Sequence, residues 1–82
     1  MKKKSRRKYY RDKNFLVKIG RRIRRYRLAQ EMTQTHLAFA CKNIDYTQIG
    51  KMERGEVNFT ISYLVLVANA LNILPRDLLP PS

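Results

Sequence analysis

The sequence predicts a single all-α domain, and three observations support that prediction. Apolar residues recur every three or four positions through most of the chain, which is the spacing of an amphipathic helix. No segment alternates between apolar and polar residues with the period of two that marks a β-strand. Thr33, Asp45 and Thr60, which favour helix N-termini, directly precede three of the apolar-periodic segments. At 82 residues the chain holds one domain with a modest core, so self-association is a reasonable expectation.

The N-terminal segment is expected to differ from the rest of the chain. Residues 1–14 (MKKKSRRKYYRDKN) lack hydrophobic periodicity, so we expect a basic, flexible arm ahead of a domain formed by residues 15–82. Fully extended, such an arm reaches about 45 Å. Basic arms commonly lie along phosphates or enter the minor groove of DNA.

The first helix is expected over residues 15–30. Its apolar residues recur at helical spacing and predict one buried stripe: Leu16, Ile19, Ile23 and Tyr26. Four arginines between positions 21 and 25 occupy the remaining surface of this helix.

A second, short helix is expected to begin after Thr33 as its N-cap. Its apolar positions are Leu37, Ala38 and Cys41. For the cysteine, core packing is favoured over redox sensing. Lys42-Asn43 predicts a turn, because asparagine tolerates the left-handed backbone conformation.

The third helix is expected to start after Asp45 and to run through Arg54, with Ile49 and Met52 on its inward side. Gly55 is expected to end it, because glycine readily takes the left-handed conformation at a helix C-terminus.

Two further helices are expected at the C-terminal end, which makes five in total. Thr60 predicts the N-cap of the fourth, whose buried stripe would consist of Ile61, Leu64, Val65, Ala68 and Leu71. Pro75 fits the first turn of a last short helix that ends near Leu79.

Charge is concentrated in the first third of the chain, whose overall formal net charge is +12. Residues 1–27 hold 14 Lys and Arg and one acid, giving +13, whereas residues 28–82 hold four bases and five acids, giving −1. A local basic block of this kind usually binds a polyanion, either nucleic acid or an anionic membrane surface. The alternative is an ordinary solvated charged surface.

Composition argues against several classes of protein. No apolar run is long enough to cross a membrane, and the N-terminal lysines are not followed by the apolar stretch of a secretory signal. One cysteine and one histidine, His36, indicate neither an internal disulfide nor a metal site. Both facts fit a reducing, cytoplasmic location, and we expect association with the nucleoid. We find no catalytic constellation, so we expect a protein that is not an enzyme and has no cofactor.

Residues 33–54 form the pattern that indicates function: a short helix, a tight turn and a second short helix. Two such helices, fixed at a steep angle by apolar anchors, place a helix end in the major groove of DNA. The segments that carry a family resemblance are Ile23 to Arg27, Met32-Thr33-Gln34, Leu37-Ala38, Ile49 to Gly55 and Leu64 to Ile73.

With these segments, the chain resembles the phage-repressor (Cro/XRE-type) helix-turn-helix family over about residues 16–79. The family includes phage repressors, restriction-modification controllers and small bacterial regulators. The resemblance implies a compact five-helix lambda-repressor-like domain with the helix-turn-helix at its second and third helices. It also implies a sequence-specific regulator of transcription that binds double-stranded DNA.

The resemblance implies that residues at the start of the third helix contact base edges. These are Tyr46 and Thr47, with Lys51 one turn later and Gln48 as a weaker candidate. Lysine donates to guanine O6 and N7, and a threonine methyl packs on thymine. Each of these residues is alternatively an ordinary solvated side chain.

Other positions are assigned backbone or structural roles by the same resemblance. Gln34 and Arg54 would contact phosphates, and Gly50 would let the helix backbone approach DNA closely. Arg27 and Glu53 resemble a buried ion pair that joins the first helix to the third. Gln34 is alternatively an ordinary first-turn residue, and Gly50 a tolerated substitution.

Departures from the family pattern bear mainly on the site. One extra residue at Lys42-Asn43 lengthens the turn and would tilt the third helix. Glu31 replaces an expected glycine or asparagine, Phe59 replaces a common proline, and His36 replaces a frequent glutamate.

Family members usually bind paired half-sites as two-fold dimers, so we expect a homodimer. The expected dimer interface lies near the C-terminal end and consists of Tyr63, Leu66, Ile73, Leu74 and Leu78. A local core under the last helix is the alternative.

An alternative function is that of an antitoxin or protein-interaction module with the same fold. RNA or membrane binding through the arm alone would leave the second and third helices without a role.

Overall fold

The computed structural model describes residues 10–81, and within them the chain forms helices and no strand, which confirms the all-α class. The elements in chain order are α1 (Lys13–Ala29), α2 (Gln34–Ala40), α3 (Tyr46–Glu53), α4 (Ile61–Ala70) and the 3₁₀ helix η1 (Pro75–Leu78). The described part thus has four α-helices rather than five. A full fifth helix does not form because Pro80 and Pro81 follow closely, and neither can donate a backbone N–H.

α1 begins two residues earlier than expected, because Asp12 caps it. The Asp12 carboxylate accepts a hydrogen bond of 3.0 Å from the Phe15 backbone N–H. Lys13 and Asn14, expected in the arm, are therefore helical. Residues 1–9, where the rest of the arm is expected, lie outside the described residues.

The three N-caps expected from the sequence are confirmed. Thr33 Oγ1 accepts from the His36 N–H at 3.0 Å, and Asp45 Oδ1 accepts from the Thr47 N–H at 3.0 Å. The hydroxyl of Thr60 does the same at the start of α4. The caps explain why the starts of these helices can be read from the sequence.

Left-handed backbone conformations mark the turns. Lys42 and Asn43 have φ of 59° and 60°, so the longer α2–α3 turn uses two such residues in succession. Glu31 adopts φ 58° after α1, where glycine or asparagine was expected. Gly55 ends the third helix segment with φ 72°, as expected, and its Cα lies so close to α1 that a Cβ would clash with Val17.

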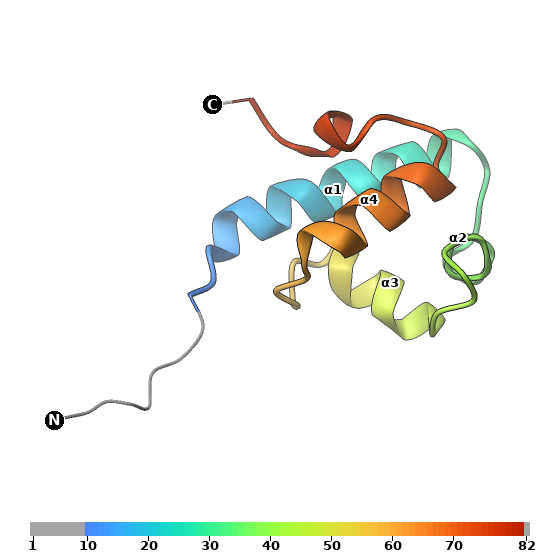
Figure 1. The fold of residues 1–82 in the computed structure, drawn as a ribbon, viewed down its shortest axis with the longest axis horizontal. Helices are drawn as coiled ribbons and strands as arrows, with labels where there is room; N and C mark the ends of the chain where they lie inside the picture. Colours follow the sequence, from blue (N-terminus) through green and yellow to red (C-terminus); the bar gives the residue numbers. More distant parts are fainter. Residues whose placement is uncertain (1–9, 82) are drawn as a thin grey trace, which may run out of the picture.

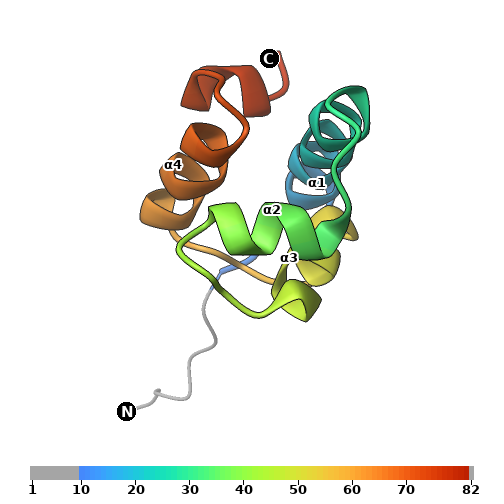
Figure 2. The ribbon, with the colours of Figure 1, turned by 90° about the vertical axis from the view of Figure 1, so that its right-hand side faces the viewer.

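The four α-helices and η1 share one apolar core. α3 packs against α1 and α2, α4 packs against η1 and α2, and η1 also contacts α1. Figure 2 shows α1 and α4 on opposite sides of the molecule, with α2 and α3 beneath them. The core consists of buried residues from every element: Ile19, Ile23, Leu37, Ala38, Cys41, Ile49, Met52, Leu64, Val67, Ala68, Leu71 and Leu78. Burial raises the pKa of the Cys41 thiol to about 11, so it stays neutral near pH 7 and packs as an apolar group.

The buried stripe of α4 differs from the one expected. Ile61 is 75% exposed and Val65 is 37% exposed, whereas Val67 is fully buried. The stripe follows Leu64, Val67, Ala68 and Leu71, which recur at steps of three and four. Ile61 and Val65 share the spacing of a helix face, but that face is rotated toward solvent.

None of the helices between residues 10 and 81 combines the length and the apolar character needed to cross a bilayer.

Candidate nucleic-acid interface

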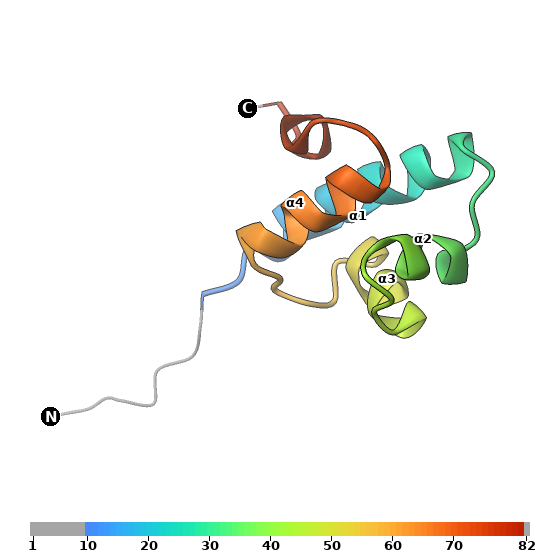
Figure 3. The ribbon, with the colours of Figure 1, turned by 45° about the vertical axis from the view of Figure 1, so that its right-hand side comes forward.

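α2, the following turn and α3 form a helix-turn-helix whose inner side is fully anchored. Leu37 and Ala38 of α2 meet Ile49 and Met52 of α3 in the core. Figure 3 shows α2 and α3 together, on the opposite side of α1 from the C-terminal segment. Because the inner sides of both helices are buried, the pair can offer only its outer side to a ligand.

The residues predicted to contact bases lie on that outer side. Thr47 and Lys51 are exposed and stand one turn apart on α3, and Tyr46, at its first position, is 53% exposed. Gln48 is half-buried, which agrees with its weaker assignment. The structure therefore brings Thr47 and Lys51 together on one face, with Tyr46 beside them.

Asp45 adds a negative charge at the start of this face. Hydrogen bonds from Thr47 to its carboxylate, aided by the charge of Lys51, hold the pKa of Asp45 below its ordinary value. The carboxylate is thus ionised near neutral pH and caps α3.

A buried ion pair fixes α3 to α1. Arg27 Nε donates to Glu53 Oε2 at 2.6 Å, and Arg27 Nη2 donates to Oε1 at 3.0 Å. Arg27 Nη1 also donates to the Met32 carbonyl at 2.7 Å, so the same guanidinium holds the segment that leads into α2. Both side chains are almost fully buried. The expected pair is formed, and it ties three elements of the fold together.

Gln34, expected to contact phosphate, is connected to that pair. Its Nε2 donates to Glu53 Oε1 at 3.2 Å, and the residue is half-buried at the first position of α2. The amide retains further hydrogen-bonding capacity, because each side-chain amide has two donors and an acceptor. The hydrogen bond to Glu53 sets the position of the Gln34 side chain.

We expected Gly50 to present its backbone to DNA, but in the structure this residue is buried. A Cβ at this position would lie 3.1 Å from Arg54 Nη1 and 3.4 Å from Gln34 Oε1. Gly50 is buried beneath these two side chains, which are both predicted to contact phosphate. Its small size makes room for these two side chains, and close approach of DNA to the Gly50 backbone stays a prediction.

Arg54 forms an ion pair that sequence reasoning missed. Its Nε lies 2.8 Å from Glu56 Oε2, and its Nη2 lies 3.1 Å from Glu56 Oε1. The hydrogen bonds and charge of Glu56 raise the pKa of Arg54, and the same hydrogen bonds lower the pKa of Glu56. Both side chains are more than half exposed. No periodic pattern involves Glu56, so the sequence offered no signal for this contact.

The α3–α4 loop also holds the residues just before α1. Asn58 Nδ2 donates to the Tyr10 carbonyl at 2.8 Å, and Arg11 Nη1 donates to the Glu56 carbonyl at 3.2 Å. Residues 10 and 11 are thereby placed beside the loop that follows α3, a position that the sequence did not indicate.

The residues expected at a dimer interface divide into two groups. Leu74 is 51% exposed, and Tyr63, Leu66 and Ile73 are partly buried at the edge of the core. Leu78 is fully buried within the protomer, so its assignment to an interface was wrong. The physical reason is that η1 turns the Leu78 side chain inward against α1 and α4.

The chain is similar to known regulators over most of its length. Residues 23–79 match the helix-turn-helix family HTH_3. Control protein C.BamHI of Bacillus amyloliquefaciens is 34% identical over 67 residues, which cover 80% of this chain and 82% of that protein. The crystal structure of the restriction-modification controller protein C.AhdI from Aeromonas hydrophila is 40% identical, with a TM-score of 0.73 over 77% of this chain and 94% of that one. A hypothetical transcription factor, NHTF from Neisseria, is 26% identical, with a TM-score of 0.75 over 92% of this chain and 86% of that one.

Proposed function

The chain belongs to the helix-turn-helix family HTH_3, and from this premise we propose that it binds a specific operator through α3 as a homodimer. It is a DNA-binding transcriptional regulator, as its family and relatives are. The single observation that carries the proposal is the exposed pair Thr47 and Lys51 on the outer face of α3. That face belongs to a helix held rigidly by the buried Arg27–Glu53 ion pair.

In this proposal, base recognition comes from the N-terminal half of α3. Lys51 donates to guanine in the major groove, and the methyl of Thr47 packs on thymine. Tyr46, at the first position of α3, also contacts base edges. Gln48, being half-buried, contributes less.

Backbone contacts position the helix. The side chains of Gln34 and Arg54 both lie next to Gly50, so α2 and the end of α3 offer two adjacent donors to one stretch of phosphates. Glu53 accepts a hydrogen bond from the Gln34 amide and so orders this side chain before DNA binds. This order reduces the side-chain entropy that is lost on binding.

The relatives suggest which genes are regulated. One relative is the control protein C.BamHI, and another, C.AhdI, is described as a restriction-modification controller protein. Because this chain matches each of them over more than three quarters of its length, we propose that it controls restriction-modification genes.

The proposed dimer uses the outward side of α4 and the segment after it. Leu74, Leu66, Tyr63 and Ile73 supply apolar surface there. A two-fold dimer would present two α3 helices to successive major grooves, one helical turn of DNA apart.

Selection of bound sequences from random duplexes, followed by footprinting of the most enriched sequence, tests the proposal. We expect a site with two-fold symmetry, with half-sites about one helical turn apart. The matched comparison is the variant Thr47→Ala/Lys51→Ala, which removes both outward groups and leaves the α3 core unchanged. An enriched sequence that this variant binds as tightly as the wild type would contradict the role of α3. No enrichment at all would contradict operator binding itself.

A further inference from the structure

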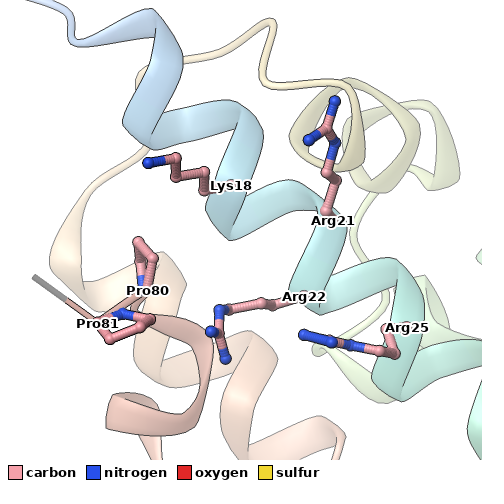
Figure 4. Close-up of a pocket in the computed structure, with 6 residues that line it drawn as sticks. All are labelled: Lys18, Arg21, Arg22, Arg25, Pro80 and Pro81. Atoms are coloured by element: carbon pink, nitrogen blue, oxygen red, sulfur yellow. The ribbon is translucent and has the colours of Figure 1, made fainter.

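A strip of positive charge runs along α1, outside the helix-turn-helix. Lys18, Arg21, Arg22 and Arg25 recur at steps of three, one and three, so they share one side of the helix. We refer to these four residues as the α1 basic stripe. Together with Pro80 and Pro81 they line one open pocket, and Figure 4 shows Arg22 extending toward the prolines while Arg21 extends away from them.

Lys18, Arg22 and Arg25 face away from α3, whereas Arg21, directly after Gly20, lies at the edge of the stripe nearer α3. Gly20 marks the side of α1 that contacts α3, because a Cβ there would clash with the backbone carbonyls of the last residues of α3. Lys18 and Arg22 each stand two residues from Gly20, which places them about 200° around the helix. Figures 1 and 3 agree, since α3 and the C-terminal segment lie on opposite sides of α1. A straight duplex held by α3 therefore lies on the far side of α1 from the stripe.

Among residues 10–81, no acidic side chain forms an ion pair with the stripe. α1 contains no acidic residue. The ion pairs found within residues 10–81, Arg27–Glu53 and Arg54–Glu56, lie elsewhere. Arg22 Nη1 donates to the Asp77 backbone carbonyl at 3.4 Å, which leaves its positive charge uncompensated. Like charges one helical turn apart repel, and a bound anion would relieve that repulsion.

The composition of the stripe favours nucleic acid over an acidic peptide. A peptide-binding surface usually has a buried apolar anchor, and the only apolar residues lining this pocket are the two prolines. Three guanidinium groups and one ammonium, with no acid among them, fit the phosphates of a nucleic-acid backbone.

We infer that the α1 basic stripe is a second DNA-binding surface, without sequence preference, that holds the backbone of a second duplex segment while α3 holds the operator. The inference rests on the proposed operator binding for its first duplex. The stripe itself uses no residue of the helix-turn-helix. One protein assembly would thereby join two DNA segments.

A bridging assay with the full chain tests this inference. A donor-labelled operator duplex and an acceptor-labelled duplex of unrelated sequence are mixed with protein at about 50 mM salt, and energy transfer reports their joining. The test variant is Lys18→Gln/Arg25→Gln, because neither side chain hydrogen-bonds to any residue between 10 and 81 and glutamine preserves the helix. We expect about tenfold weaker bridging and unchanged operator affinity, since two phosphate contacts are lost.

The control variant, Lys42→Gln/Arg76→Gln, has the same net charge as the test variant and leaves the stripe intact. It should bridge like the wild type. Equal bridging by the test variant, or no bridging by the wild type at low salt, overturns the inference. Tight, stripe-dependent binding of a polyglutamate peptide without stripe-dependent duplex binding overturns it in favour of a protein partner. Operator affinity in the same sample reports on the proposed function separately.

Discussion

Lys51 is the residue whose replacement separates base recognition from general attraction to DNA. It is exposed on α3, one turn after Thr47. Lys51→Ala should relax specificity at one base pair per half-site by about 1–3 kcal/mol without changing the melting temperature. Binding of single-substitution operators measures this effect. Lys42→Ala removes the same charge from the turn, and a similar loss of discrimination in that variant would count against base contact by Lys51.

Glu56 should weaken DNA binding in the wild type. Its carboxylate holds the guanidinium of Arg54 by two hydrogen bonds, and a phosphate must compete for the same donors. Glu56→Gln should therefore raise affinity about two- to fivefold for operator and unrelated duplexes alike.

The effect should vanish in an Arg54→Gln background. Fluorescence anisotropy of the four proteins, as a double-mutant cycle, measures the coupling. A loss of affinity in Glu56→Gln alone would instead mean that Glu56 positions Arg54 for phosphate.

Apart from the N-caps, contacts between single residues were predictable only where a family pattern covered them. The Arg27–Glu53 pair could be expected because both residues match the family pattern. The Arg54–Glu56 and Tyr10–Asn58 contacts could not, because they depend on how the α3–α4 loop folds back. Leu78 was misassigned because an apolar residue near the C-terminus fits a core or an interface equally well until its direction is known.

At the scale of elements, the contact between α1 and α3 depends on glycine. A Cβ at Gly20 would lie 2.5 Å from the Glu53 carbonyl oxygen, which is backbone and cannot move away cheaply. Gly20→Ala should therefore lower the free energy of unfolding by about 1–3 kcal/mol, despite the higher helix propensity of alanine. Thermal unfolding followed by circular dichroism measures it.

Gly50→Ala is the matched comparison within α3. There the nearest atoms belong to the flexible side chains of Arg54 and Gln34, at 3.1 Å and 3.4 Å. Stability should be unchanged or should rise by up to about 1 kcal/mol from helix propensity. DNA affinity should fall, since the new methyl displaces two proposed phosphate donors. Equal destabilisation by both substitutions would contradict the packing described for α1 and α3.

The positions of the elements were largely predictable, because capping residues mark where helices start. The first helix was misplaced by two residues because Asp12 lies inside a basic segment and was not recognised as a cap. In α4, apolar residues occupy nearly every position, so periodicity alone could not choose the buried face. Packing of α4 against η1 and α2 buries Val67 and leaves Val65 and Ile61 exposed.

For the whole molecule, the proposed dimer depends on apolar surface after α4. Leu74 is half exposed, so Leu74→Lys should weaken self-association by at least about 1 kcal/mol and leave the protomer folded. Sedimentation velocity over a range of concentrations measures the dimer. Ile61→Lys is the control, because Ile61 is also exposed but lies at the opposite end of α4. A wild-type chain that remains monomeric up to on the order of 100 μM contradicts the dimer.

The uneven distribution of charge predicts how the N-terminal segment contributes to binding. Residues 1–9 carry six lysines and arginines, and Tyr10 and Arg11, which follow them, are held at the loop after α3. Deleting residues 1–9 preserves these contacts and the Asp12 cap. If the segment contacts only phosphates, its removal should lower affinity for all duplexes alike and reduce the slope of log affinity against log salt by up to about 5.

Replacing the same six cations by glutamine, at full length, should reproduce the effect of the deletion. Binding is measured on the operator and on an unrelated duplex between about 50 and 200 mM salt, where the counterion contribution is large. A changed ranking of operator variants after either change would mean that the segment also reads bases, as arms do in a minor groove. An unchanged salt slope would mean that charge near α1 and α3 supplies the attraction by itself.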